Sequence, residues 1–189
     1  MPGAVSPRAA SPRAASPRAG SRRAWGWHAL VADWAVRIVD DSPVRPGDLV
    51  LDLGAGEGAL TSPLAATGAR VLAIELHPGR AESLRRRFDG TRVTVVEVSL
   101  SDLVLPHRPF RVVANPPFDG ASGLVRTLLT SPHLLSADLV LQRGAVRGLL
   151  DRAPVRNRRH QLSAGRPVPR RAFLPAPNVD SAVLRIRRR

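Results

Sequence analysis

The sequence contains no cysteine, no tyrosine and no lysine, so all 29 of its Lys+Arg residues are arginines. Without cysteine, disulfide-stabilised scaffolds and cysteine-ligated metal centres are excluded. The five histidines lie far apart and lack the close helical spacing of a zinc-binding helix, so we expect no metal site. Every apolar run is far shorter than the roughly 20 residues that span a bilayer, and no signal-type apolar segment follows the basic N-terminus. These absences predict a soluble, cytoplasmic protein that does not bind membranes.

Positive charge is concentrated at the two ends of the chain. The formal net charge is +14. Residues 1–23 contain five Arg and no acid, residues 24–150 contain 13 Arg and 13 acids, and residues 151–189 contain 11 Arg and two acids. A chain of 189 residues is long enough for one domain with its own core. Because the central part is neutral, the clustering of charge at the ends needs a physical explanation.

A five-residue repeat, Ser-Pro-Arg-Ala-Ala or Ser-Pro-Arg-Ala-Gly, begins at Ser6, Ser11 and Ser16. A proline in every unit excludes a regular helix, and the absence of large apolar side chains predicts an extended, disordered arm over residues 1–23. We interpret the arm first as a solvated tail and second as a phosphate-binding segment. A transit peptide ranks third, because the prolines would interrupt the amphipathic helix that such peptides form.

The rest of the chain, residues 24–189, has the pattern of a single alternating α/β domain. Strands separated by helices predict a parallel sheet with helices on both of its faces. Prolines between residues 167 and 177 indicate a loop-rich stretch, and the last strand, with one apolar and one basic side, is expected to pair antiparallel with the sheet. The predicted helices cover residues 25–41, 57–67, 78–88 and 122–130, and the predicted strands cover residues 49–53, 71–75, 93–98, 111–115, 138–142 and 182–187.

The turn after the first predicted long strand is rich in glycine and reads Asp52-Leu53-Gly54-Ala55-Gly56-Glu57-Gly58. In an open α/β sheet, a ligand binds beyond the carboxyl ends of the strands, where glycines let the backbone approach it closely. Glu75, at the end of the second strand, is placed to accept hydrogen bonds from both ribose hydroxyls of a nucleoside. The alternative is an ordinary βα turn with a surface glutamate. Two acids in the turn would repel a pyrophosphate, so the pattern favours a nucleoside with a cationic end.

A second motif, Asn115-Pro116-Pro117-Phe118, directly follows the fourth predicted strand. Such a segment is often only a turn, but in a fold with a nucleoside site it resembles the catalytic motif of adenine-N6 methyltransferases. The exocyclic amine of adenine is a poor nucleophile because its lone pair is delocalised into the ring. The Asn115 side-chain oxygen and the Pro116 carbonyl could hold both N–H groups and align the lone pair, while Phe118 stacks on an extruded base.

From Trp25 to the C-terminus, the sequence resembles the erythromycin-resistance rRNA adenine-N6 methyltransferases and, more distantly, the 16S rRNA adenine dimethyltransferases. Two further segments carry the resemblance. Gly26-Trp27-His28-Ala29-Leu30 stands in place of the family's G-Q-N/H-F-L, and Phe173-Leu174-Pro175-Ala176-Pro177-Asn178-Val179-Asp180-Ser181 is close to its F-x-P-x-P-x-V-D/N-S. The resemblance implies a Rossmann-like S-adenosylmethionine-dependent methyltransferase fold, with a mostly parallel seven-stranded sheet whose last strand is antiparallel. It also implies a monomer that methylates ribosomal RNA, with 23S rRNA favoured, and gives resistance to macrolide, lincosamide and streptogramin antibiotics.

The same resemblance assigns roles to individual residues. It implies Asn115, Pro116 and Phe118 as catalytic residues. It implies S-adenosylmethionine contacts from Trp27, His28, Leu30, Asp52, Gly54, Gly56, Glu75, Leu76, Ser99 and Asn115. It implies RNA contacts from Phe118, Arg158, Arg159, Arg170, Arg171 and Phe173, with Phe173 lining the target-base pocket opposite Phe118.

The chain also departs from the family pattern. Trp27 replaces a cofactor-binding Gln, so this wall either stacks on the cofactor or belongs to a tryptophan core. Ser99 replaces an Asp that binds the cofactor's adenine, so either Asp102 substitutes for it or the site is weakened. We also expect no helical RNA-holding domain after the catalytic domain. The basic residues of the C-terminal part then become candidates for a phosphate track: Arg152, Arg156, Arg158, Arg159, Arg166, Arg170, Arg171, Arg187, Arg188 and Arg189.

Two alternatives remain open from the sequence alone. One is a 16S rRNA adenine dimethyltransferase, which the same motifs would serve. The other is a non-catalytic RNA-binding protein on the same scaffold, with cofactor binding eroded by Trp27 and Ser99. The intact Asn115-Pro116-Pro117-Phe118 segment argues against the second alternative.

Overall fold

The computed structural model describes residues 28–117, 120–152 and 159–189. The predicted arm at residues 1–23, as well as Trp27, Phe118, Arg156 and Arg158, lies outside these ranges. Within them, no helix is both long and apolar enough to cross a membrane. The elements are β1 (Ala29–Leu30), α1 (Ala32–Asp40), β2 (Leu49–Leu53), α2 (Thr61–Ala66), β3 (Arg70–Ile74), α3 (Pro78–Arg87), β4 (Val93–Val96), β5 (Phe110–Ala114), α4 (Ala121–Thr130), β6 (Leu134–Gln142), α5 (Arg143–Asp151), β7 (His160–Val168), a 3-10 turn (Arg170–Ala172), β8 (Phe173–Leu174) and β9 (Ser181–Arg188).

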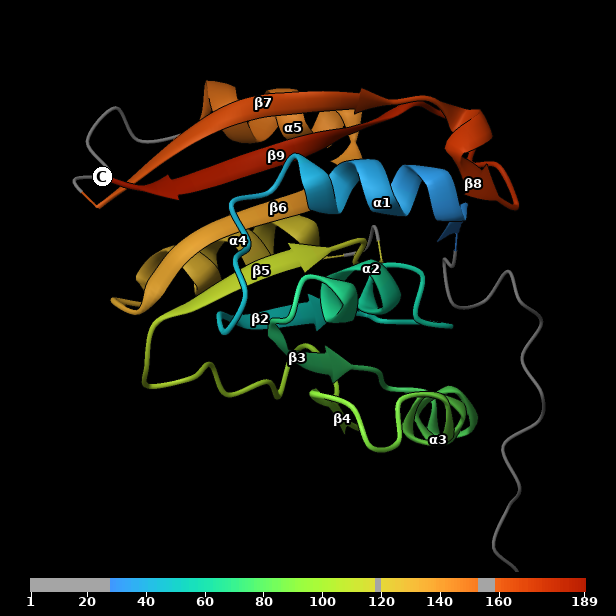
Figure 1. The fold of residues 1–189 in the computed structure, drawn as a ribbon. Coiled ribbons are helices and arrows are strands. Elements are labelled where there is room, and N and C mark those ends of the chain that lie inside the picture. The colour runs from blue at the N-terminus through green and yellow to red at the C-terminus, as the bar shows by residue number, and fades with distance from the viewer. Residues whose placement is uncertain (1–27, 118–119, 153–158) are drawn as a thin grey trace, which may run out of the picture.

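A seven-stranded sheet with the order β4-β3-β2-β5-β6-β9-β7 forms the centre of the molecule (Figure 1). The pairings from β4 to β6 are parallel, whereas β9 runs antiparallel to both β6 and β7. The predicted fold class, a mostly parallel seven-stranded sheet with an antiparallel last strand, is therefore confirmed. A separate two-stranded pairing joins β1 to β8.

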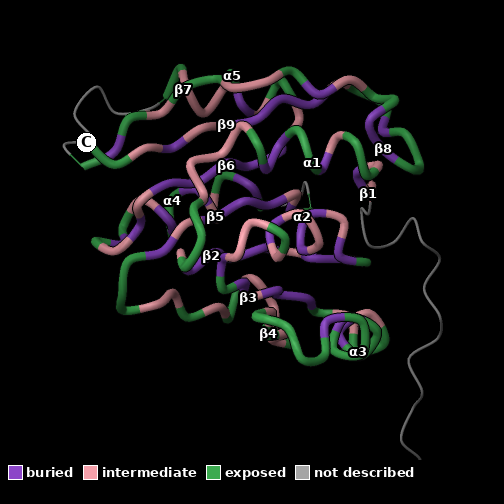
Figure 2. Tube along the Cα trace, in the orientation of Figure 1, coloured by how far each residue is buried: buried purple, intermediate pink, exposed green. Residues whose placement is uncertain are grey.

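The two faces of the sheet bury different side chains because successive residues of a strand point in opposite directions. On β2, Leu49, Leu51 and Leu53 pack in the cluster that includes α4 and α5, whereas Val50 packs in the cluster that includes α1 and α2. Figure 1 shows these helix pairs on opposite faces, and Figure 2 shows that the central strands are largely buried. The same alternation places Asp52 on the face that carries α2.

Two predicted boundaries were wrong for identifiable reasons. The helix predicted from residue 25 begins only at Ala32, because residues 29 and 30 pair with β8. The helix predicted from residue 57 begins at Thr61, because Gly58, inside the predicted range, adopts a positive φ angle of 85°. This angle is incompatible with a right-handed helix.

The edge strand β7 was not predicted, and its last two residues lie in the loop-rich stretch expected before the last strand. Pro167 lies inside β7, where the register with β9 shifts between Ala164 and Pro167. Proline is tolerated on an edge strand or at such an irregularity, because no ladder hydrogen bond depends on its missing N–H. The helix α5 was not predicted either, and the strand predicted at residues 138–142 begins earlier, at Leu134.

Part of the C-terminal positive charge is neutralised inside the fold. Arg166, expected on a phosphate track, instead donates two hydrogen bonds to Asp41 at 2.7 and 2.8 Å. These bonds lower the pKa of Asp41. Arg187, also a candidate for the track, donates to Asp138 at 2.7 Å, and Arg185 lies 3.8 Å from the same carboxylate. Asp138 is buried, and this burial raises its pKa despite the hydrogen bond from Arg187. Arg166 and Arg187 are therefore structural residues that join α1, β6, β7 and β9.

Replacing Arg187 with Ala should destabilise the domain, because the buried carboxylate of Asp138 would lose its shortest charged hydrogen bond. We expect the free energy of unfolding, measured in urea at pH 7, to fall by about 2–3 kcal/mol. The neighbouring Arg188 is exposed, so Arg188→Ala is the matched control and should change stability by less than about 0.5 kcal/mol. Equal losses in the two variants would contradict a structural role for Arg187.

Candidate active site

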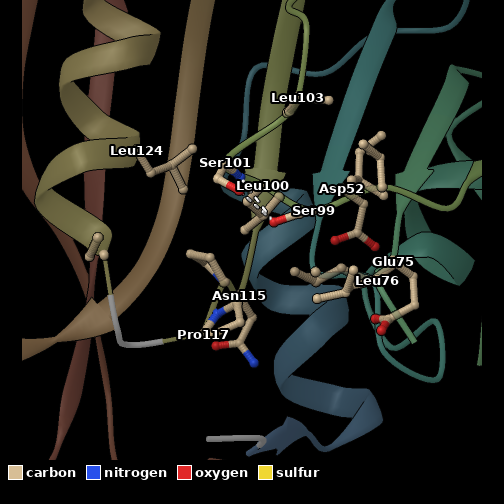
Figure 3. A pocket seen from close by; sticks show the side chains of 18 of the residues that line it. Asp52, Glu75, Leu76, Ser99, Leu100, Ser101, Leu103, Asn115, Pro117 and Leu124 are labelled. Atoms are coloured by element: carbon tan, nitrogen blue, oxygen red, sulfur yellow. Dashed lines mark hydrogen bonds between the residues drawn. The ribbon is translucent and has the colours of Figure 1, made fainter. Parts of the chain in front are cut away.

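A cavity of about 650 Å³ opens beyond the carboxyl ends of the strands β2, β3 and β5. The sheet order places β3 on one side of β2 and β5 on the other, so the cavity lies at the point where the strand order reverses. This is where open α/β sheets bind ligands, and the volume is that of an ordinary small-molecule site. Asp52, Glu75, Ser99 and Asn115, all predicted site residues, lie around this one cavity (Figure 3).

The glycine turn is folded back onto the end of β3. The backbone N–H groups of Gly54 and Ala55 donate to the carbonyl of Ile74 at 2.9 Å, and Gly56 N–H donates to Glu75 Oε2 at 2.8 Å. A Cβ atom built on Gly54 would lie 3.1 Å from Cδ of Pro117. Glycine is therefore required at position 54 for two reasons: its φ angle is 78°, and the glycine turn contacts the Asn-Pro-Pro segment at this point.

Glu75 is held from both sides at the rim of the cavity. Its Oε1 atom accepts the N–H of His77 at 2.8 Å, its Oε2 atom accepts that of Gly56, and the Arg80 guanidinium lies 3.7 Å away. The residue is only 5% exposed. Each carboxylate oxygen has two lone pairs, so Glu75 keeps the capacity to accept ligand hydroxyls in a fixed orientation. Its predicted role in binding ribose stays a prediction.

Asp52 borders the same cavity but is almost fully buried. It is 1% exposed, and the Thr61 hydroxyl donates to its Oδ2 atom at 2.6 Å. Burial raises the pKa of Asp52 to about 7, against the opposing effect of the Thr61 hydrogen bond. Asp52 can therefore change charge near neutral pH at the floor of the cavity.

Asn115 lies at the end of β5 with its amide group fixed. Its Nδ2 atom donates to the backbone carbonyl of His28 at 2.8 Å. A carbonyl can only accept, so this bond requires the nitrogen to face His28 and leaves Oδ1 as the acceptor for other partners. Pro116 and Pro117 follow along the cavity wall and restrict the backbone that carries the Pro116 carbonyl.

His28 connects three of the sequence motifs. Its carbonyl holds Asn115, and its ring Nδ1 lies 2.8 Å from the carbonyl oxygen of Pro175, to which it donates. The antiparallel pairing of Ala29 with Leu174 and of Leu30 with Phe173 continues this junction. His28 therefore links the segment expected near the cofactor and the segment expected near the target base to the Asn115 side chain.

Several predicted site residues do not reach the cavity. Phe173 is only 1% exposed, packs in the core with Leu30 and Val183 and does not line the cavity; its expected contact with the target base stays a prediction. Asp102 is not among the residues that line the cavity, so it does not take the place of Ser99, which does. The predicted contacts of Trp27, Phe118 and Arg158 lie outside the described residues.

The predicted RNA-binding arginines that the structure describes lie on the surface. Arg159, Arg170 and Arg171 are exposed, and Arg170 also donates from Nε to the Pro177 carbonyl at 2.7 Å. The segment 28–30, with His28 and Leu30, reaches the cavity as expected, and so do Gly54 and Leu76. The glycine at position 56 holds Glu75 through its N–H. The sequence pattern did not predict the apolar wall of the cavity, which is formed by Leu100, Leu103, Leu105 and Leu124. The closely spaced leucines after the third predicted strand are the signal that could have indicated it.

The raised pKa of Asp52 predicts a pH-dependent stability. The native state keeps the Asp52 proton up to about pH 7, whereas the unfolded chain loses it near the ordinary value of 3.8. The stabilisation is therefore complete below pH 3.8 and disappears as the pH rises through about 7. Between pH 5 and 8, the free energy of unfolding of the wild type should fall by about 2–3 kcal/mol relative to that of Asp52→Asn. The asparagine can still accept the hydrogen bond from the Thr61 hydroxyl. Urea unfolding at several pH values tests this, and parallel pH profiles of the two proteins would contradict it.

Comparison with known proteins agrees with this arrangement. A family model described as "Ribosomal RNA adenine dimethylase" matches residues 32–189. An rRNA adenine N-6-methyltransferase of Streptomyces fradiae is 36% identical over 169 residues, which cover 84% of this chain and 52% of the relative. A ribosomal RNA small subunit methyltransferase A of Thermosynechococcus vestitus is 34% identical over 168 residues, which cover 80% of this chain and 63% of the relative. The chain spans about half the length of several of the curated relatives it matches.

Solved structures give the same result. The 23S rRNA methyltransferase ErmE superposes with a TM-score of 0.76 at 32% identity, covering 85% of this chain and 69% of that one. A dimethyladenosine transferase from Plasmodium falciparum, at 23% identity and a TM-score of 0.72, covers 86% of this chain and 64% of that one and shares the fold. The resemblance inferred from the motifs is confirmed, and the chain belongs to the ribosomal RNA adenine dimethylase family of S-adenosylmethionine-dependent methyltransferases.

Proposed function

We propose that this protein transfers a methyl group from S-adenosylmethionine to N6 of an adenine in 23S ribosomal RNA, and thereby confers resistance to macrolide, lincosamide and streptogramin antibiotics. The observation that carries the proposal is the fixed Asn115 amide. Its nitrogen is bound to His28, so its oxygen is available as an acceptor in the cavity that Glu75 borders. A site with that acceptor beside a constrained proline carbonyl suits an exocyclic amine with two N–H groups.

The residues around the cavity fit the cofactor by their chemistry. Glu75 would accept from the ribose hydroxyls, Leu76 would pack against the purine, and the turn from Gly54 to Gly56 would lie along the amino-acid end. Trp27, His28 and Leu30 are proposed to close the opposite wall. Asp52 would favour a cationic ligand, since a nearby positive charge stabilises its ionised form. When bound, S-adenosylmethionine supplies the electrophilic methyl group on its sulfonium.

The protein's part in the reaction is alignment. Asn115 Oδ1 and the Pro116 carbonyl accept the two N6–H groups, which turns the nitrogen lone pair toward the methyl carbon. The new N–C bond forms as the S–C bond breaks, S-adenosylhomocysteine is released, and one N6 proton passes to solvent. Holding the two reactants in line can contribute roughly 7–11 kcal/mol to lowering the barrier. Phe118 is proposed to stack on the extruded base.

RNA binding is assigned to Arg158, Arg159, Arg170 and Arg171, of which the last three are exposed. Surface arginines suit a phosphate backbone. Arg170 and Arg171 follow β7 at the edge of the sheet where the cavity opens, whereas Arg159 precedes β7 at the opposite edge. Phe173 is buried, so it is assigned no contact with the RNA backbone. Single-stranded or loop adenine is favoured as the target, since an unpaired base is extruded most easily.

The second candidate is dimethylation of 16S ribosomal RNA. It is supported by the 34% identity to a small-subunit methyltransferase. The 23S assignment is preferred because of the motif resemblance and is supported by the TM-score of 0.76 with a 23S rRNA methyltransferase. The two candidates share a mechanism and differ only in which RNA is methylated.

The direct test is incubation of the protein with radiolabelled S-adenosylmethionine and separated 23S and 16S rRNAs. We expect label in 23S rRNA, at a position that primer extension then maps. Label in 16S rRNA alone would select the second candidate, and label in neither would contradict the proposed activity.

Variants of Asn115 test the catalytic geometry. Asn115→Ala removes the acceptor, and Asn115→Asp places a carboxylate oxygen against the His28 carbonyl, so both should lower the methylation rate by about 100-fold or more. Gln161→Ala removes an exposed amide on β7 and should leave the rate unchanged. A fully active Asn115→Asp protein would show that the amide orientation is not used.

Contact between Gly54 and Pro117 predicts that the cofactor turn and the catalytic segment are coupled. Gly54→Ala should lower methylation by roughly 10- to 100-fold, because its Cβ would displace Pro117. Gly47 has a similar φ of 82° with no atom near its Cβ position. Gly47→Ala should therefore cost similar stability, about 1–2 kcal/mol, and leave the rate unchanged. Equal rates in the two variants would refute the coupling.

A further inference from the structure

Two serine hydroxyls form a hydrogen-bonded pair on the wall of the cavity. Ser99 Oγ and Ser101 Oγ lie 2.8 Å apart, and either atom can be the donor (Figure 3). Both residues line the cavity and belong to the loop that follows β4. Serine hydroxyls rotate freely and can each donate and accept, so the direction of the hydrogen bond within the pair is reversible.

The pair lies beside the position expected for the base of a bound nucleoside. β3 and β4 are parallel with Ile74 opposite Val96, and Glu75 N–H donates to the Val96 carbonyl. The chain therefore leaves both strands at the same edge of the sheet, next to Glu75. Leu76 follows Glu75 and keeps 48% of its surface exposed, as an apolar platform within the cavity wall. A base whose ribose is bound to Glu75 can lie on Leu76 and direct its polar edge toward the serine pair.

Among the described residues, the loop after β4 contributes no carboxylate to the cavity wall. In the part of the chain that the structure describes, the acids that line the cavity are Asp52 in β2, Glu57 in the turn after β2 and Glu75 directly after β3. Asp102 does not line the cavity, but its Oδ1 accepts a long hydrogen bond from Ser101 Oγ at 3.4 Å. The Ser101 hydroxyl can exchange this bond for the shorter one to Ser99 Oγ at 2.8 Å. The polar edge of a base would therefore be read by hydroxyl groups rather than by an acceptor-only carboxylate.

The two common 6-substituted purines present opposite patterns at this edge. Adenine has an N–H donor at position 6 and an acceptor at N1, whereas hypoxanthine has an acceptor at position 6 and a donor at N1. A pair of hydroxyls can complete a ring of hydrogen bonds with either one. With adenine, the 6-amino group donates to one serine, which donates to the other, which donates to N1. With hypoxanthine, every bond in the ring reverses.

We propose that Ser99 and Ser101 determine cofactor specificity, and that this pair lets the site bind the 6-oxopurine form of the cofactor about as well as the adenine form. The inference rests on the proposed function, because it requires that the nucleoside end of S-adenosylmethionine binds in this cavity. A carboxylate at position 99 would accept from the 6-amino group but repel a 6-oxygen. The chain has instead a contact that does not discriminate between the two.

Calorimetry with the full chain tests this inference, using S-adenosylhomocysteine and S-inosylhomocysteine as probes. We expect the two dissociation constants of the wild type to agree within about fivefold. Ser99→Asp should favour the adenosyl compound by at least about 20-fold, because the carboxylate leaves the 6-oxygen unpaired and repelled. Ser122→Asp is the matched control, since Ser122 is exposed on α4 and does not line the cavity. The ratio of its two dissociation constants should equal that of the wild type.

The outcomes separate this inference from the proposed function. If the wild type binds S-adenosylhomocysteine but binds the inosyl compound more than 20-fold more weakly, the specificity proposal is overturned and the methyltransferase proposal stands. A ratio in Ser99→Asp that stays near that of the wild type would also overturn it. If the wild type binds neither compound, cofactor binding itself fails, and both proposals fail with it.

Discussion

The hydrogen bond from Asn115 to the carbonyl of His28 is the contact on which the site depends. It orients the amide at the end of β5, and the same histidine is tied through its ring to the Pro175 carbonyl. Segments from residues 28–30, 115–117 and 173–175 therefore meet at one side chain. Because Gly54 packs against Pro117, the glycine turn belongs to the same contiguous unit. The orientation of the Asn115 side chain therefore depends on segments that lie far apart in the sequence.

The net charge does not show how the acidic residues are distributed between the cavity and the C-terminal strands. The acids at the cavity come from the ends of β2 and β3, where burial makes the charge of Asp52 sensitive to pH. On the same face of the sheet, Asp41 and Asp138 each engage arginines of the C-terminal strands. These pairs leave the net charge unchanged, but they occupy arginines of the C-terminal strands, so fewer arginines of this segment remain for a polyanionic partner than its composition suggests.

The sequence predicted the features that depend on local pattern. Buried strands followed by glycine or Asn-Pro-Pro segments located the cavity, and the alternation of Ala182, Leu184 and Ile186 with basic residues identified the antiparallel strand. Contacts between distant segments could not be predicted. Nothing local to Ala29 and Leu30 shows that they pair with β8, and nothing in Arg166 shows that Asp41 is its partner. Phe173 was placed in the site by its motif, but the β1–β8 pairing turns its side chain into the core beside Leu30.

The position of β9 in the sheet has a consequence for biosynthesis. β9 lies between β6 and β7, so until residues 181–188 have left the ribosome, β6 presents an unpaired edge and β7 has no neighbour in the sheet. Exposed strand edges invite pairing with other chains. The nascent protein consequently carries an aggregation-prone edge until almost the whole of this sequence has been made, and only then does the domain close.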